Sequence, residues 1–138
     1  MAAKDIFHNA VRRALEKQQW TITADPLRLK FGGVTFQVDL AAEKILAADR
    51  GDEKIAVEVK SFLNPSAVTD FYAALGQFLS YRLALIETEP DRFLYLAVPL
   101  DTYQSFFQLA FAQAAIEQYE VKIMVYDSTD EAIIQWIK

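Results

Sequence analysis

The chain has 138 residues, a formal net charge of −5 and no cysteine. We expect one domain over residues 1–138, because this length fits a single hydrophobic core. Disulfides, thiolate metal sites and cysteine nucleophiles are excluded. The single histidine, His8, leaves too few groups for a histidine-based metal site or a Ser-His-Asp triad, so we expect it on the surface or in helix packing.

The distribution of apolar residues and charge narrows the class of protein further. The first residues lack the uninterrupted apolar run of a signal peptide, and no later run is long enough to cross a bilayer, so we expect a soluble, cytoplasmic protein. The negative charge argues against a protein that binds nucleic acid nonspecifically through clustered Lys and Arg.

The first half of the chain predicts a helix followed by strands. Residues 5–19 have apolar side chains at helical spacing, which indicates an amphipathic helix. From Trp20 to Leu40 the apolar pattern becomes the shorter one that is typical of strands, and Gly32-Gly33 predicts a hairpin turn. Residues 44–62 predict a second hairpin around the polar turn Asp49-Arg50-Gly51-Asp52.

The second half alternates helices and strands. Ser66 is suited to cap a helix over residues 68–86, and residues 92–100 have the length of a strand. Residues 101–119 are in helical register. Residues 121–138 resemble two strands, although the last is also compatible with a helix. This order predicts an α/β fold in which helices cover a mixed sheet.

A charged pair lies in a strand that should be buried. Residues 55–60 alternate so that Glu58 and Lys60 share one face. Because burying either charge alone is costly, the pair must reach solvent, neutralise itself or hold an ion. This arrangement suits metal-assisted phosphodiester hydrolysis, in which carboxylates hold Mg²⁺ and the lysine orients water or stabilises the phosphate. The alternative is an ordinary strand-end pair on a solvated face.

Another metal carboxylate should come from the preceding strand. If the hairpin turns near residues 51–52, paired positions sum to about 103, which predicts Ile45 opposite Glu58. The nearest upstream carboxylates are then Glu43 and Asp39, of which Glu43 is closer by this register. Both are candidates, and a solvated turn carboxylate is the alternative for each.

The helix after this strand contributes a second pattern. Gln77 and Tyr81 are four residues apart and therefore project from one helical face. Here Gln77 is suited to contact a metal-bound water or the scissile phosphate, and Tyr81 to contact the DNA backbone. The alternative is that Tyr81 packs in the core and Gln77 lies on a polar rim.

Together these motifs resemble the PD-(D/E)xK nuclease superfamily, in particular its branch with a RecB-like QxxxY signature. The resemblance covers about residues 5–100 and implies a restriction-endonuclease-like fold and DNA cleavage with Mg²⁺ or Mn²⁺. It implies Asp39 or Glu43 as the first metal carboxylate, Glu58 as the second and Lys60 as the catalytic lysine. One departure is Val38, which stands where the motif has a proline.

Residues 38–66 and 70–82 are also similar to the XisH family, cyanobacterial controlling factors for excision of the fdxN element. This similarity spans nearly the full length and implies programmed, site-specific DNA excision alongside a recombinase and the small companion XisI. A nuclease can remain acidic if metal ions offset its site carboxylates and a partner supplies affinity for DNA.

Two functions from different classes follow. In the first, the protein is a Mg²⁺-dependent DNA endonuclease or a DNA-processing accessory. In the second, it is a weakly active or inactive nuclease-fold subunit that binds an XisI-like protein or a recombinase; a homodimer is also compatible with the sequence. The acidity favours the second function, and the combination of Glu58, Lys60, Gln77 and Tyr81 favours the first.

Overall fold

The structure, a computed structural model, describes residues 3–45 and 51–138. Its helical elements are α1 (Ala3–Lys17), α2 (Ala67–Thr88), α3 (Leu100–Gln104), a 3₁₀ turn η1 (Phe106–Gln108) and α4 (Ala110–Gln118). Its strands are β1 (Thr21–Ala24), β2 (Leu27–Phe31), β3 (Val34–Val38), β4 (Leu40–Ile45), β5 (Asp52–Val59), β6 (Arg92–Pro99), β7 (Ile123–Asp127) and β8 (Ala132–Ile137).

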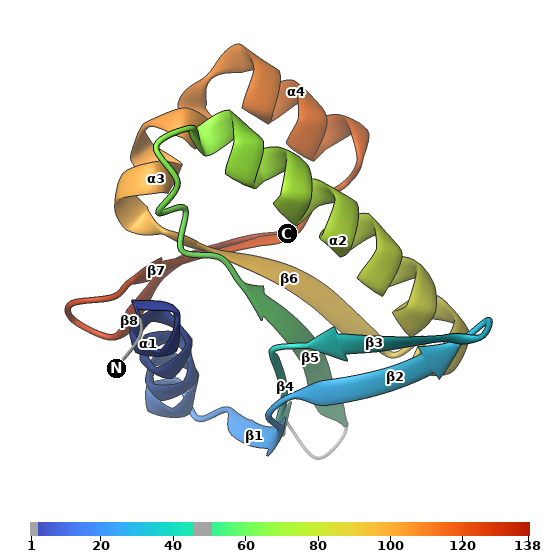
Figure 1. The fold of residues 1–138 in the computed structure, drawn as a ribbon. Coiled ribbons are helices and arrows are strands. Elements are labelled where there is room, and N and C mark those ends of the chain that lie inside the picture. Colours follow the sequence, from blue (N-terminus) through green and yellow to red (C-terminus); the bar gives the residue numbers. More distant parts are fainter. Residues whose placement is uncertain (1–2, 46–50) are drawn as a thin grey trace.

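The strands form one large mixed sheet and one small sheet. The large sheet has the order β1-β4-β5-β6-β7-β8, and β2 pairs with β3 apart from it. Strands β5, β6 and β7 are parallel, whereas β1, β4 and β8 are antiparallel to their neighbours. Helix α1 covers one face, and α2, α3 and α4 lie on the other (Figure 1). The prediction of a mixed α/β fold is confirmed, and the architecture is compatible with a restriction-endonuclease-like fold.

The alternation of strand β5 divides its side chains between two hydrophobic cores. Ile55 and Val57 pack in the core beneath α1, whereas Ala56 packs in the core beneath α2. Because alternate residues of a strand share a face, Glu58 and Lys60 lie on one face, as the sequence predicts, and this face is the one directed to α2. The carboxyl end of β5 therefore carries both charges toward α2.

Most predicted elements are confirmed. Ser66 caps α2, its side chain accepting a hydrogen bond from the backbone N–H of Thr69. Gly32 and Gly33 have φ angles of +59° and +84°, which a two-residue hairpin turn of the primed type requires at both central positions. The C-terminal segment forms strands β7 and β8. The predicted turn at residues 49–52 lies largely outside the described residues, although β4 and β5 do pair as a hairpin.

The prediction of one helix over residues 101–119 is wrong. The backbone leaves helical geometry at Ser105 and is extended at Leu109. These breaks let the adjacent rings of Phe106 and Phe107 both pack against Phe71. The free energy gained by burying these aromatic rings exceeds that of the few helical hydrogen bonds that are lost. Tertiary packing therefore overrides the helical pattern.

In the described part of the chain, no helix has the length and apolarity needed to cross a membrane.

Candidate metal and active site

The candidate site is centred on Glu58, at the carboxyl end of β5. Glu58 is buried, with 6% of the whole residue exposed. Its Oε1 atom accepts a hydrogen bond from the backbone N–H of Asp39 at 3.2 Å. Its Oε2 atom lies 3.3 Å from the ammonium of Lys60. Both carboxylate oxygens of Glu58 are thus held by specific donors.

Asp39 lies beside Glu58, immediately before β4. Its Oδ2 atom accepts a hydrogen bond from the backbone N–H of Val59 at 2.8 Å. The two side chains therefore take backbone donors where the β4–β5 ladder ends, after the pair Leu40 and Val57. This reciprocal arrangement fixes both carboxylates next to each other.

The predicted register of the hairpin is wrong, and the correction decides between the two upstream carboxylates. Ile45 pairs with Asp52, and Glu43 pairs with Lys54. Extending this register by one pair beyond β4 brings Asp39, rather than Ile45, opposite Glu58. The predicted turn was placed three residues too far along the chain, since the pairs of β4 and β5 are centred between positions 48 and 49 rather than between 51 and 52.

Lys60 joins the strand to helix α2. Its ammonium donates a hydrogen bond to Oε1 of Gln77 as well as contacting Glu58. Its backbone N–H donates to the carbonyl of Ala97 on β6 at 3.0 Å. The structure therefore brings together Glu58, Lys60 and Gln77, from a strand and a helix that the sequence linked only by pattern.

The hydroxyl of Tyr126 supports Lys60 from strand β7, a contact that sequence reasoning missed. It donates to the carbonyl of Lys60 at 2.9 Å. Burial, followed by the charge of Asp101, raises the pKa of Tyr126, so this phenol remains a donor at neutral pH. Tyr126 is one apolar-patterned residue in a buried strand, and nothing in its spacing signals this role.

Tyr81 is half-buried and packs edge-to-face on Phe36, with 6.2 Å between ring centroids. Burial raises its pKa, and the negative charges of Glu58 and Asp39 raise it further. The phenol therefore belongs to both the core and the edge of the site, which combines the two interpretations offered by the sequence.

Burial also raises the pKa of Glu58, to about 7 from 4.5, and the neighbouring Asp39 adds to this rise. The ammonium of Lys60 acts in the opposite direction but does not offset the cost of desolvation. Two carboxylates held this close in a largely dry place need added positive charge to be ionised together. A proton supplies it at low pH, and a cation is the other means.

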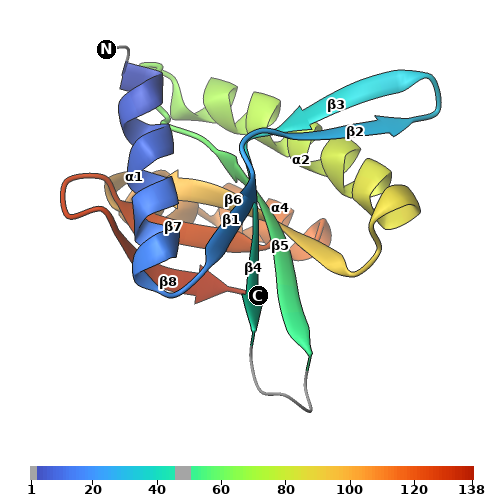
Figure 2. The ribbon, with the colours of Figure 1, turned by 90° about the horizontal axis from the view of Figure 1, so that it is seen from below.

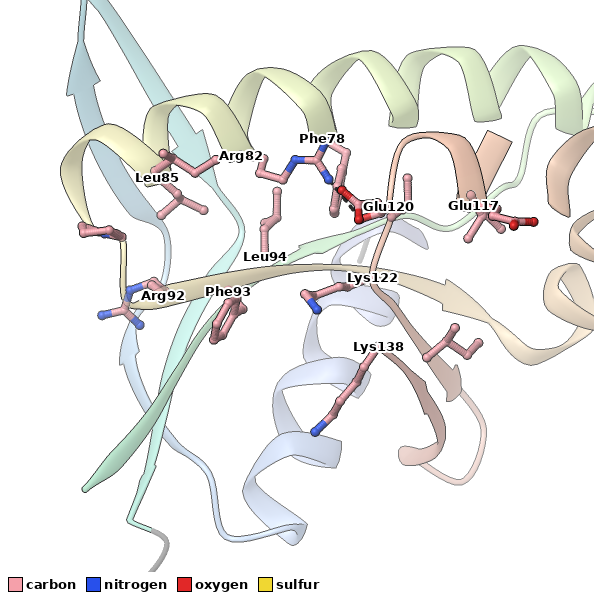
Figure 3. A pocket seen from close by; sticks show the side chains of 15 residues that line it. Phe78, Arg82, Leu85, Arg92, Phe93, Leu94, Glu117, Glu120, Lys122 and Lys138 are labelled. Carbon is pink, nitrogen blue, oxygen red and sulfur yellow. Dashed lines mark hydrogen bonds between the residues drawn. The ribbon is translucent and has the colours of Figure 1, made fainter. Parts of the chain in front are cut away.

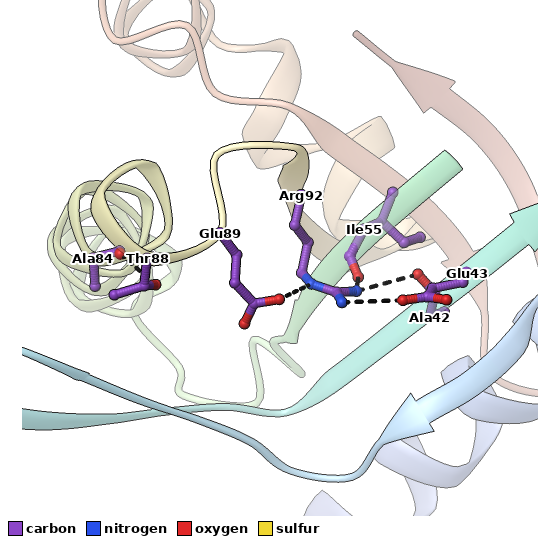
Figure 4. Close-up of polar contacts among 7 residues, drawn as sticks. All are labelled: Ala42, Glu43, Ile55, Ala84, Thr88, Glu89 and Arg92. Carbon is purple, nitrogen blue, oxygen red and sulfur yellow. Dashed lines mark hydrogen bonds and ion pairs between the residues drawn. The ribbon is translucent and has the colours of Figure 1, made fainter. Parts of the chain in front are cut away.

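Glu43, the other candidate, lies at the opposite end of the hairpin. It is four residue pairs from the site along β5, or roughly 13 Å. Its Oε1 atom is 3.3 Å from the guanidinium of Arg92, which also contacts Glu89 (Figure 4). The structure does not bring Glu43 to Glu58.

The donor set fits Mg²⁺. In residues 3–45 and 51–138, no three His, Asp or Glu side chains form a metal-binding cluster. Asp39 and Glu58 are two adjacent carboxylates, and Mg²⁺ usually binds through one or two carboxylates while keeping several waters and taking substrate phosphate oxygens. Their hard oxygen atoms would hold the ion beside Lys60.

A separate pocket of about 780 Å³ lies between the end of α2, the start of β6 and the end of α4 (Figure 3). Two of its cations are engaged: Arg82 donates to the carbonyls of Tyr119 and Glu120, and Lys122 lies over the ring of Phe93. None of the predicted site residues lines this pocket. It is thus distinct from the carboxylate and lysine site.

The fold and the site define a mixed α/β protein, compatible with a restriction-endonuclease-like architecture, with paired carboxylates and a lysine where β5 ends. The XisH protein family matches residues 1–134, so the chain belongs to the XisH family. A comparison with curated proteins found no match.

Two crystal structures of similar proteins extend this result. An XisH family protein from Nostoc punctiforme is 52% identical, with a TM-score of 0.89 and coverage of 97% of this chain and 100% of that chain. A fdxN element excision controlling factor protein from Anabaena variabilis is also 52% identical, with a TM-score of 0.89 and coverage of 97% and 99%.

Proposed function

We propose that this protein acts in the control of DNA element excision as a Mg²⁺-dependent DNA endonuclease. The relative from Anabaena variabilis is named a fdxN element excision controlling factor, and excision of a DNA element requires broken phosphodiester bonds. The observation that carries the proposal is the meeting of Asp39, Glu58 and Lys60 at one strand end, within hydrogen-bonding distance of one another or of a shared neighbour.

Asp39 and Glu58 would hold the cation. When bound, Mg²⁺ polarises a phosphate oxygen and lowers the pKa of water, and Mn²⁺ can replace it. The backbone N–H groups of Val59 and Asp39 fix one oxygen of each carboxylate, which leaves the pair preorganised. A preorganised pair loses little conformational entropy on binding.

Lys60 would orient the attacking water or stabilise the charge that develops on the phosphate. Gln77 holds the ammonium from α2, and the contact with Glu58 holds it from the strand. With 24% of its side chain exposed, Lys60 remains accessible to a substrate. Tyr81, beside both carboxylates, is suited to contact the DNA backbone.

The experiment is a cleavage assay on supercoiled, branched and single-stranded DNA with Mg²⁺ or Mn²⁺. We expect cleavage by the wild-type protein and loss of cleavage in the variants Glu58→Ala and Lys60→Ala. Matched substitutions on the same strand, Glu53→Gln and Lys54→Ala, lie at the other end of β5 and should leave cleavage unchanged. Equal activity in Glu58→Ala and wild type would refute the site.

A second candidate function is the partner-binding role of a weakly active or inactive subunit. Several large apolar side chains on the helical layer are exposed, among them Leu83, Ile86 and Phe111. Leu83 and Ile86 lie three residues apart on α2 and so share a helical face, and we propose this exposed apolar face as the docking surface. Absence of cleavage on every substrate, together with tight binding to an XisI-like protein or a recombinase that Leu83→Asp weakens, would favour this function.

A further inference from the structure

The hairpin of β2 and β3 is a two-stranded ribbon that belongs to neither edge of the large sheet. Figure 2 shows it extending alongside α2, away from the large sheet. Its five residue pairs run from Leu27 and Val38 at the base to Phe31 and Val34 at the Gly32-Gly33 turn. The ribbon is therefore a projection with a free tip.

The two faces of the ribbon differ in chemistry. Leu29 is buried, and Leu27 and Phe36 pack against the core beneath α2. Because side chains alternate along each strand, the other face carries two cross-strand pairs, Arg28 with Gln37 and Lys30 with Thr35. All four of these side chains are exposed. The ribbon thus presents a polar face to solvent.

This polar face has a positive charge in an acidic protein. The segment of residues 27–38 contains Arg28 and Lys30 but no Asp or Glu, whereas the whole chain has a net charge of −5. Arg12, Arg13 and Arg92 are each paired with a carboxylate. In the part of the chain that the structure describes, neither Arg28 nor Lys30 has such a partner, so both charges are available to an anion.

The ribbon is built into the candidate site. Its last residue, Val38, is followed directly by Asp39, and Phe36 packs on Tyr81. Arg28 is one residue pair from the base of the ribbon and Lys30 is three pairs from it, or roughly 3 and 10 Å. A polyanion that contacts both cations is therefore held within reach of the carboxylates.

We propose that the polar face of this ribbon binds the backbone of double-stranded DNA and holds it at the site. The inference rests on the proposed nuclease function and adds the substrate-gripping element. A two-stranded ribbon fits a duplex groove, and Arg, Lys, Thr and Gln side chains all contact phosphate oxygens. Single strands are bound mainly by stacking on aromatic rings, which the polar face lacks.

The test is fluorescence anisotropy with a labelled 30-base-pair duplex, at several salt concentrations in EDTA. The double variant Arg28→Gln/Lys30→Gln should bind about tenfold more weakly than wild type near 100 mM salt. Its plot of log affinity against log salt should be shallower by about 2, since each phosphate contact contributes about 0.9. The matched variant Lys17→Gln/Lys138→Gln removes the same charge from exposed positions at the end of α1 and after β8, and it should bind within twofold of wild type.

Three results would overturn the inference: no duplex binding by wild type, an unchanged affinity and salt slope in the ribbon variant, or an equal loss in the matched variant. Preferential binding of a single strand of the same sequence, unaffected by the ribbon substitutions, would also overturn it. Cleavage by wild type is assayed separately. Ribbon-dependent binding without cleavage supports the inference and defeats the proposed function; cleavage without ribbon-dependent binding does the reverse.

Discussion

Strand β5 and its neighbours carry a carboxylate and cation pair at each end, and both pairs have the same separation. Glu58 lies 3.3 Å from Lys60 at one end, and Glu43 lies 3.3 Å from Arg92 at the other. Arg92 is almost fully engaged, because its guanidinium also donates to Glu89 and to two backbone carbonyls. Its 7% exposed side chain ties β4, β5 and the end of α2 together.

The Glu58 end is different in its electrostatics. Here two carboxylates share one ammonium, and burial raises the pKa of Glu58 to about 7. The Arg92 end balances two carboxylates with a permanently charged guanidinium and satisfied donors. Contact distance alone therefore does not identify a functional ion pair. Burial of the carboxylate distinguishes the candidate metal site, because the Glu58 side chain is 8% exposed, whereas those of Glu43 and Glu89 are 32% and 35% exposed.

The largest expected effect separates the two upstream carboxylates. Replacing Asp39 by Asn should reduce Mg²⁺-dependent cleavage at least about 100-fold, because it removes a metal carboxylate while keeping the side-chain shape. Glu43→Gln should reduce it less than threefold, since Glu43 contacts Arg92 instead. Initial cleavage rates measure this. A larger loss in Glu43→Gln than in Asp39→Asn would reverse our assignment.

The choice between the two upstream carboxylates could not be made from the sequence. Alternation along residues 55–60 predicted the faces of Glu58 and Lys60, and helical spacing predicted that Gln77 and Tyr81 lie together. The choice between Asp39 and Glu43 depends on hairpin register, which depends on the position in the chain where the turn is centred. A shift of six in the sum of paired positions changes which upstream carboxylate faces Glu58.

The Arg92 end of β5 should give the next largest effect, which is on the stability of the fold. Arg92→Met keeps the aliphatic packing but leaves two carboxylates and two carbonyls without their donor. We expect the free energy of unfolding to fall by roughly 2 to 4 kcal/mol, because breaking a buried pair leaves groups uncompensated. Urea unfolding measures it. Lys54→Met, on the same edge, should cost less than about 1 kcal/mol.

The Glu58 end of β5 is tested by the pH dependence of stability. The pKa of Glu58 is higher in the folded protein, about 7, than its ordinary value of 4.5, so the folded state holds a proton that the unfolded state releases. In EDTA, this contribution to stability is fully present below pH 4.5 and is lost as the pH rises through 7. The loss should be roughly 2 to 3 kcal/mol.

The control for this prediction is Glu58→Gln, which cannot titrate. Urea unfolding at pH 5 and pH 8 should show a smaller loss of stability in this variant than in wild type. Parallel losses in the two proteins would mean that Glu58 is not the group responsible.

The smallest effect concerns the support of Lys60. Tyr126→Phe removes the hydroxyl that donates to the Lys60 carbonyl at 2.9 Å and should cost roughly 1 kcal/mol of stability. Cleavage should fall less than tenfold, since Gln77 and Glu58 still hold the ammonium. Tyr95→Phe is the matched buried substitution. A larger stability loss in Tyr95→Phe would deny the Tyr126 contact a specific role.

Contacts between residues that are far apart in the sequence cannot be predicted from sequence pattern. Tyr126 is 66 residues from Lys60, and Arg92 is 49 residues from Glu43, so no local periodicity connects them. The single helix expected over residues 101–119 failed for a related reason. Packing of Phe106 and Phe107 on Phe71 is a tertiary preference, and it outweighs helical spacing.

The most direct test of the central claim is the binding of Mn²⁺, followed by electron paramagnetic resonance of the free ion, with Mg²⁺ as competitor. The claim is that Asp39 and Glu58, rather than Glu43, form the cation site. Wild type and Glu43→Gln should bind the ion with similar affinity at pH 8, whereas Asp39→Asn and Glu58→Gln should each lose that binding. Unchanged binding in Asp39→Asn and Glu58→Gln, or its loss in Glu43→Gln, would contradict the account.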